Sequence, residues 1–133
     1  MRKTFKSATL ILASLATVFF IQSCDKNEHT STSPVIIFDE PADSTVIEAG
    51  SALHIEGEAS DNDALHEGRF QIITDANVTL WDTAVTVHGL KEYHFHMHRH
   101  QTVSDTTHAT LRATFSDHDE LVTTKEVTLT FLP

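Results

Sequence analysis

Several residue types are scarce in this chain, and each scarcity excludes a class of protein. A single cysteine cannot form a disulfide within the chain. Only 4 glycines and 3 prolines among 133 residues are too few for a collagen-like or low-complexity protein. The hydrophobic content of 40% is too high for a wholly disordered chain. We therefore expect one small globular domain that folds without disulfides.

Basic residues are also scarce. The chain has 9 lysines and arginines against 19 aspartates and glutamates, which gives a net charge of -10 with histidine neutral. Nucleic acids and anionic membrane surfaces are bound through basic patches, so we expect no nucleic-acid partner. Cations are the more natural ligands of such a chain, and its 10 histidines supply nitrogen donors.

The first 24 residues have the features of an export signal. Arg2, Lys3 and Lys6 precede an uncharged, mostly apolar run over residues 7–21, and the only cysteine, Cys24, follows soon after. The run is shorter than the roughly 20 residues that a membrane-spanning helix needs. We interpret residues 1–23 as a signal peptide with a helical apolar segment.

The pair Ser23-Cys24 resembles the end of a bacterial lipoprotein signal, although Ile21 and Gln22 differ from the usual residues of that motif. The resemblance implies that Cys24 is lipidated, becomes the new N-terminus and holds the protein to a membrane. It also implies a location in the bacterial cell envelope, with the outer membrane expected, facing the periplasm or the outside. The alternative is an ordinary secretory signal in which the cysteine falls by chance.

Processing before Cys24 would remove three basic residues and no acidic one, so the net charge would become −10 − 3 = −13. Residues 24–33 are polar and contain no large apolar side chain. We predict that this lipidated segment is a flexible tether.

Beyond residue 33 the apolar residues alternate with polar ones, β-branched residues are abundant and helical spacing is nearly absent. This pattern predicts strands throughout. Clusters of aspartate, asparagine, serine, glycine and proline separate them, as expected of turns. The predicted strands are 35–38, 53–59, 67–74, 78–87, 93–97, 109–115 and 127–131.

Seven short strands over about 100 residues predict an all-β fold, an immunoglobulin-like antiparallel sandwich of residues 34–133. A small antiparallel barrel is the alternative. The order of an extended start with Pro34, Gly50-Ser51 before the second strand, and aspartate-rich turns after the second and sixth strands resembles small immunoglobulin-like lipoprotein domains of unknown function from Bacteroidota. That resemblance implies the fold and the envelope location and brings no established activity.

Four histidines alternate with other residues near the fifth predicted strand. Alternate residues of a strand share a face, so the four imidazoles form one row while Tyr93, Phe95 and Met97 point to the core. The row is too long for a single ion, so a site needs further ligands from the antiparallel second strand. The predicted metal ligands are His94, His96, His98 and His100, completed by His54, Glu56 and Glu58.

Imidazole and carboxylate donors together suit Zn(II), Cu(II) or Ni(II). The alternative is a solvated histidine face that only takes up protons, near the unperturbed pKa of about 6.5.

Two acidic turns follow the second and sixth strands and are expected at the same end of the sandwich. Asp61, Asp63, Asp117 and Asp119 could supply oxygen ligands for a weaker Ca²⁺ site. Aspartate is also common in turns because it accepts local backbone hydrogen bonds. His66 and His118, near the same turns, give an alternative mixed site.

The sequence contains none of the common catalytic motifs, so we do not expect an enzyme. The leading hypothesis is a lipid-anchored envelope protein that binds a divalent transition metal through its histidine-rich strand, as a carrier, buffer or sensor. The alternative is a non-catalytic interaction module that binds a protein or glycan partner.

Overall fold

A computed structural model describes residues 30–133 of the chain. The predicted signal peptide, Cys24 and residues 24–29 of the predicted tether lie outside the described residues. Thr30 to Ser33 approach the domain along its acidic turns, where the Ser31 hydroxyl donates to Asp117 and the Asn62 side chain donates to the Thr30 carbonyl. Within residues 30–133 there is no helix long and apolar enough to cross a membrane.

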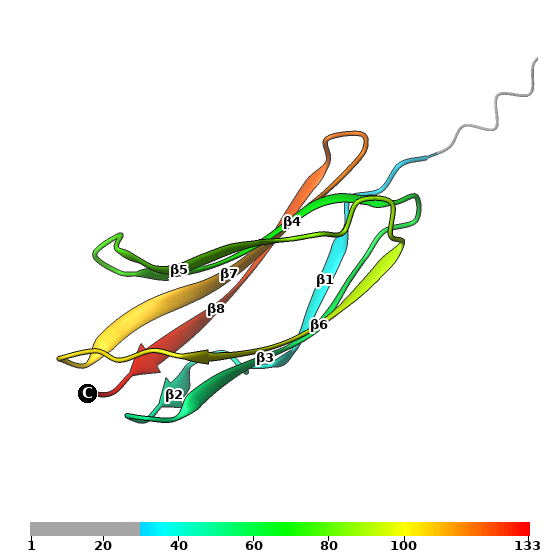
Figure 1. The fold of residues 1–133 in the computed structure, drawn as a ribbon. Helices are drawn as coiled ribbons and strands as arrows, with labels where there is room; N and C mark the ends of the chain where they lie inside the picture. Colours follow the sequence, from blue (N-terminus) through cyan, green and yellow to red (C-terminus); the bar gives the residue numbers. More distant parts are fainter. Residues whose placement is uncertain (1–29) are drawn as a thin grey trace, which may run out of the picture.

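Within residues 30–133, eight strands form two sheets that face each other (Figure 1). The strands are β1 (Val35–Glu40), β2 (Thr45–Ile47), β3 (Ala52–Ser60), β4 (Leu65–Thr74), β5 (Thr79–Val85), β6 (Glu92–His100), β7 (Thr107–Asp117) and β8 (Val122–Phe131). One sheet has the order β1-β3-β6 and the other the order β2-β8-β7-β4-β5. The predicted immunoglobulin-like sandwich is therefore confirmed, in preference to the small barrel.

Strand β2 is the element that the sequence pattern did not reveal. It has three residues, too few for alternation to be visible, and its pairing with β8 is the only parallel pairing within residues 30–133. Ile47 is buried against the core. The preceding turn is fixed by Asp43, whose carboxylate accepts the Thr128 backbone N–H at 2.8 Å and hydroxyl at 2.7 Å. These bonds, the backbone one first, lower the pKa of Asp43.

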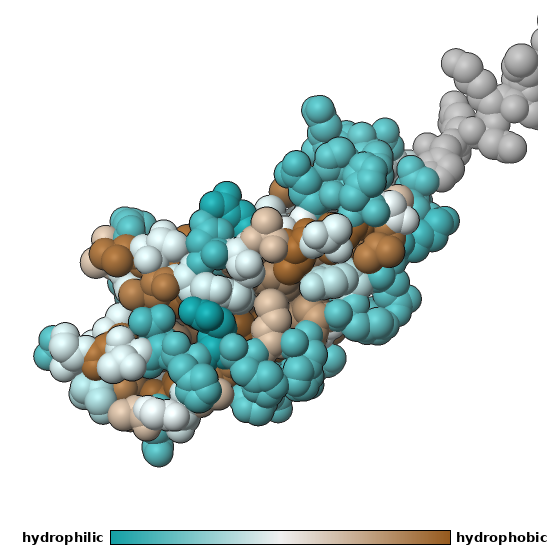
Figure 2. Space-filling model, viewed as in Figure 1, coloured by the Kyte–Doolittle hydropathy of each residue, from teal (hydrophilic) through white to brown (hydrophobic). Residues whose placement is uncertain are grey.

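Aromatic side chains from both sheets meet in the core. Phe70 and Phe115 of the larger sheet are completely buried, and their ring centroids lie 5.7 Å apart. Phe95 of β6 enters from the smaller sheet, 4.9 Å from Phe70. Figure 2 shows hydrophobic residues along the line between the sheets and hydrophilic residues over the β7–β8 turn. Because Phe95 is anchored inward, the histidines on either side of it must point to solvent.

Trp81 and Tyr93 are partly buried and pack against the core. Trp81 also lies beneath the Arg99 guanidinium, 5.0 Å from the ring centroid. This cation–π contact lies near the end of β6, on the side of the strand that faces the core.

Gly57 makes room for Phe95. The two residues are directly opposite each other in the β3–β6 ladder, and Gly57 has a φ of 154°. A Cβ at this position would lie 2.0 Å from the Ile37 carbonyl oxygen and 2.8 Å from Cζ of Phe95. The backbone carbonyl cannot move away without breaking the β1–β3 ladder, so only glycine fits.

We predict that Gly57→Ala destabilises the domain by about 3 kcal/mol or more, measured by urea unfolding, because it combines overpacking with backbone strain. Gly50→Ala is the matched control, since its φ is also positive but its Cβ would meet nothing within 4 Å. The control should lose only about 1–2 kcal/mol. Equal losses in the two variants would contradict the packing explanation.

Candidate metal centres

The four histidines of the row lie on β6, which pairs antiparallel with β3, as expected. His94 lies opposite Glu58, His96 opposite Glu56 and His98 opposite His54. His100 lies opposite Ala52, beyond the carboxylates of β3. The cross-strand arrangement inferred from alternation is thus confirmed, while metal binding by these residues stays a prediction.

Contacts on this face divide the row into two groups. His96 is central to one group: its Nδ1 lies 2.8 Å from Glu56 Oε1, and its Nε2 lies 2.8 Å from His98 Nε2. The His54 and His98 rings pack at 4.4 Å between centroids. His94 belongs to the other group, where it contacts Glu92 and lies 3.7 Å from Glu58. The four histidines therefore do not form one site.

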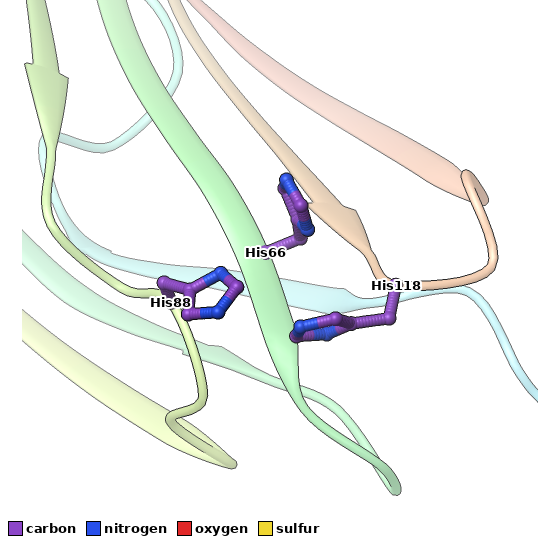
Figure 3. A group of neighbouring side chains, drawn as sticks. All are labelled: His66, His88 and His118. Atoms are coloured by element: carbon purple, nitrogen blue, oxygen red, sulfur yellow. The ribbon is translucent and has the colours of Figure 1, made fainter.

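A different set of histidines converges at the end of the sandwich near the acidic turns. His66, His88 and His118 each offer one ring nitrogen, and these nitrogens all lie within 4.8 Å of one another. The ring centroids are 4.8–5.1 Å apart. Figure 3 shows the rings gathered from three separate segments: the start of β4, the β5–β6 connection and the β7–β8 turn. We call this set the histidine trio.

A β-bulge places His66 in the trio. In the β4–β7 ladder Leu65 pairs with Asp117 and Glu67 pairs with Ser116, so His66 is an extra residue with no partner opposite it. Leu65 before the bulge is buried, while His66 and Glu67 are both exposed. Bulges commonly re-aim a side chain in this way. A regular strand would have sent one of these two neighbours inward.

A tight turn places His88. The Leu90 N–H donates to the Val87 carbonyl at 2.9 Å, and Gly89 occupies the third position of the turn with a φ of 81°, which favours glycine. The turn is joined to β4 by two further bonds. The Gly89 N–H donates to the Leu65 carbonyl at 2.9 Å, and the Leu65 N–H donates to the Leu90 carbonyl at 2.7 Å. His88 is therefore fixed next to the strand that carries His66.

A buried aspartate places His118. Asp117 is only 3% exposed, and its Oδ1 accepts the backbone N–H groups of Asp119 at 2.8 Å and Leu121 at 2.9 Å. Within the turn that this creates, His118 Nδ1 lies 3.4 Å from the Ala64 carbonyl oxygen. Only a protonated nitrogen can donate to a carbonyl, so this contact leaves Nε2 with a free lone pair. Metal-ligating histidines are typically oriented in this manner.

The four aspartates of the predicted Ca²⁺ site are not gathered into a donor set. Three sets of histidine, aspartate or glutamate side chains in residues 30–133 have ligand atoms within 4.8 Å of one another, and none includes Asp61, Asp63, Asp117 or Asp119. Asp61 accepts the Asp63 N–H at 2.8 Å, as Asp117 accepts that of Asp119. Both carboxylates thus serve their own turns, and calcium binding stays a prediction.

The geometry of the histidine trio suits a single transition-metal ion. Bonds of about 2.0–2.1 Å in a tetrahedral site place ligand nitrogens about 3.3 Å apart, so rotations of these partly or fully exposed side chains bring all three onto one ion. Three imidazoles leave a fourth position open. That position is available to water, to an exchanging ligand or to the nearby Glu67, whose Oε1 lies 3.9 Å from His66 Nε2.

A groove of about 640 Å³ adjoins the trio on the outer face of the larger sheet and is lined in part by His66 and His88. Its other lining residues include Arg69 and Asp82, which form an ion pair. The hydrogen bond from Arg69 is the main reason that the pKa of Asp82 is lowered. This carboxylate is thus paired with Arg69.

Comparison with known proteins found solved structures that resemble this chain. Neither protein-family models nor curated protein sequences match the chain. A CARDB domain from Pyrococcus furiosus, solved in complex with di-metal ions, is 10% identical, with a TM-score of 0.44 over 77% of this chain and 96% of that one. Fibronectin(III)-like modules of Clostridium thermocellum CbhA are 15% identical, with a TM-score of 0.43 over 74% of this chain and 45% of that one.

The strand topology by itself defines the class to which the chain belongs. Residues 30–133 form an immunoglobulin-like β-sandwich, built from a three-stranded and a five-stranded sheet. Histidines and glutamates on this sandwich form groups that are able to hold a metal ion.

We predict that Asp117→Ala lowers the free energy of unfolding by about 2–3 kcal/mol, because two backbone N–H groups lose a charged acceptor in a buried site. Thermal or urea unfolding measures the loss. Asp119→Ala is the control, since it keeps the backbone N–H that Asp117 binds and removes an exposed carboxylate. A control variant as unstable as Asp117→Ala would contradict the role given to Asp117.

Proposed function

We propose that the protein is a lipid-anchored protein of the bacterial cell envelope that binds a divalent transition-metal ion at the histidine trio, as a carrier, buffer or sensor. The observation that carries this proposal is the convergence of three ring nitrogens within 4.8 Å from three separate segments. The backbone bonds of Leu65 and the turn at Asp117 fix those segments. The donors are thus held together by the fold.

Zn(II) is the ion we favour at the trio, because three histidines with an open fourth position are a recurrent zinc arrangement. Cu(II) and Ni(II) also accept imidazole ligands and are competing occupants. We propose a role in binding rather than catalysis. An open position at the exposed end of the sandwich suits an ion that is taken up and released.

The envelope location rests on the first 24 residues. The basic start, the apolar run and Ser23-Cys24 support export and lipidation, and they agree with the resemblance to small lipoprotein domains from Bacteroidota. Residues 1–23 are proposed as the signal peptide, residues 24–33 as the tether and residues 34–133 as the binding domain. In this arrangement the acidic domain is held near a membrane by lipid.

A second candidate function is binding of a protein or glycan partner. It is favoured by large hydrophobic side chains exposed near the trio: Leu90 is 42%, Leu121 36% and Val122 59% exposed. Leu90 follows the turn of His88, and Leu121 closes the turn of His118. A partner docked at this end of the sandwich would cover the metal centre.

We predict that His88→Ala weakens Zn²⁺ binding by at least about 100-fold, since even outer groups that only orient a ligand contribute 10–100-fold. The measurement is calorimetric titration of the full chain, purified in detergent without a histidine tag. His108→Ala is the control. It removes another exposed histidine, bonded to Thr130 at the opposite end of β7, and should leave the affinity unchanged. Unchanged affinity in His88→Ala would overturn the assignment.

We also predict that Cys24→Ser abolishes incorporation of fatty acid into the protein, because the thiol that would be acylated is lost. Labelling of the bacterial host with a fatty acid, followed by immunoprecipitation, measures this change. Ser23→Ala keeps a small residue before the cysteine and should leave the labelling unchanged. Equal labelling of Cys24→Ser and the unaltered protein would rule out the lipid anchor.

A further inference from the structure

The outer face of the β1-β3-β6 sheet brings two carboxylates together. The β1–β3 ladder shifts register between Phe38 and Glu40, and the shift makes Asp39 an extra residue. As a result Glu40 lies directly opposite Glu56. Like charges in directly opposed positions are destabilising, so a cation bound between the two carboxylates would relieve their repulsion.

No basic side chain is available on the neighbouring positions. Within β3 and β6, which are described in full, the outward positions hold alanine, serine, glutamate and histidine, and neither lysine nor arginine. Arg99, the only arginine of β6, faces the core side and lies over Trp81. Within these two strands a bound cation would therefore reach the carboxylates without competition from a lysine or arginine.

Nitrogen donors surround the two carboxylates. Glu56 pairs with Glu40 on one side and with His96 on the other, so the three form a row across the sheet. The next row is formed by His54 and His98, whose rings pack edge to face at 4.4 Å. Ligand atoms of Glu40, His54 and Glu56 lie within 4.8 Å of one another.

The contacts of His96 orient its ring for a ligand. Its Nδ1 is 2.8 Å from Glu56 Oε1, a contact in which the nitrogen donates to the carboxylate. Nε2 of the neutral ring then accepts a hydrogen bond from His98 Nε2 at 2.8 Å, and a metal ion bound by both nitrogens would displace this shared proton. In metal sites, a histidine commonly donates one ring N–H to a carboxylate and binds the metal through its other nitrogen.

We propose that Glu40, His54, Glu56, His96 and His98 form a second divalent-metal site, separate from the histidine trio and on the opposite sheet. Its two carboxylates balance the two charges of the ion, and its mixed nitrogen and oxygen donors suit Cu(II), Ni(II) or Zn(II). The site goes beyond the proposed function, because it exists or fails independently of the trio.

Of the four histidines in the row, the proposal assigns only His96 and His98 to the second site. His94 forms a separate donor set with Glu58 and Glu92, and His100 lies opposite Ala52, so neither belongs to the five-residue site. His100 shares a strand, a face and solvent exposure with His96 and His98, and His108 is exposed on β7. Removal of His100 and His108 therefore provides a control that a nonspecific histidine-rich surface would not distinguish.

The test is native mass spectrometry and calorimetric titration of the full chain in detergent, without a histidine tag, using Zn²⁺ and then Cu²⁺ as the probe. We expect two equivalents in the unaltered protein. His96→Ala with His98→Ala should lose one equivalent, while His100→Ala with His108→Ala, which removes two exposed histidines outside every donor set of residues 30–133, should lose none. Glu40→Gln should weaken the same equivalent by at least tenfold and leave the other unchanged.

Equal losses in the two histidine double variants would overturn the site, because binding would then follow histidine number alone. An unchanged affinity in Glu40→Gln would also overturn it. His66→Ala with His118→Ala should remove only the other equivalent. Failure of that variant to lose an ion would count against the proposed function, whereas failure of the His96 and His98 variant would count against this second site.

Discussion

The backbone bonds of Leu65 are the constraint on which the histidine trio depends. Leu65 is completely buried, and both its N–H and its carbonyl are bonded to the turn at Gly89 and Leu90. On its other side it is in register with Asp117. Each residue of the trio is the immediate neighbour of one of these anchored residues. The ring positions are therefore set by a buried side chain and its ladder, and a metal ion meets donors that are already gathered, which is the general requirement for a well-organised site.

The two proposed sites would differ in how far their ligands neutralise the charge of a bound ion. The trio contributes neutral nitrogens, so a divalent ion there keeps its charge and can attract an exchangeable fourth ligand. The face with Glu40 and Glu56 neutralises the ion and removes a like-charge contact within the sheet. Both sites belong to a chain whose net charge of -10 attracts cations to its surface. Their placement on opposite sheets makes it possible for one to be occupied or altered without the other.

Alternation in the sequence was sufficient to predict the sandwich and to place the histidine row on the same face as His54, Glu56 and Glu58 of the neighbouring strand, because a period of two fixes which residues share a face. It does not fix the register, and the pairing of His96 with Glu56 is seen only in the structure. The same reasoning could not predict β2, which is too short to show alternation. It could not find His88 either, since that residue stands in a turn and joins the trio only through the long-range bonds of Leu65. The only local signal was the following Gly89, which marks a turn. Glu40 was missed because a bulge, invisible in the pattern, shifts its register.

The most direct test of the metal centre is NMR of the histidine imidazoles of the full chain in detergent during titration with Zn²⁺. The account predicts that the resonances of His66, His88 and His118 change together and saturate at one equivalent. It also predicts that Nδ1 of His118 stays protonated while Nε2 takes the metal. A titration in which these three histidines do not respond as a group, whatever the other histidines do, would contradict it.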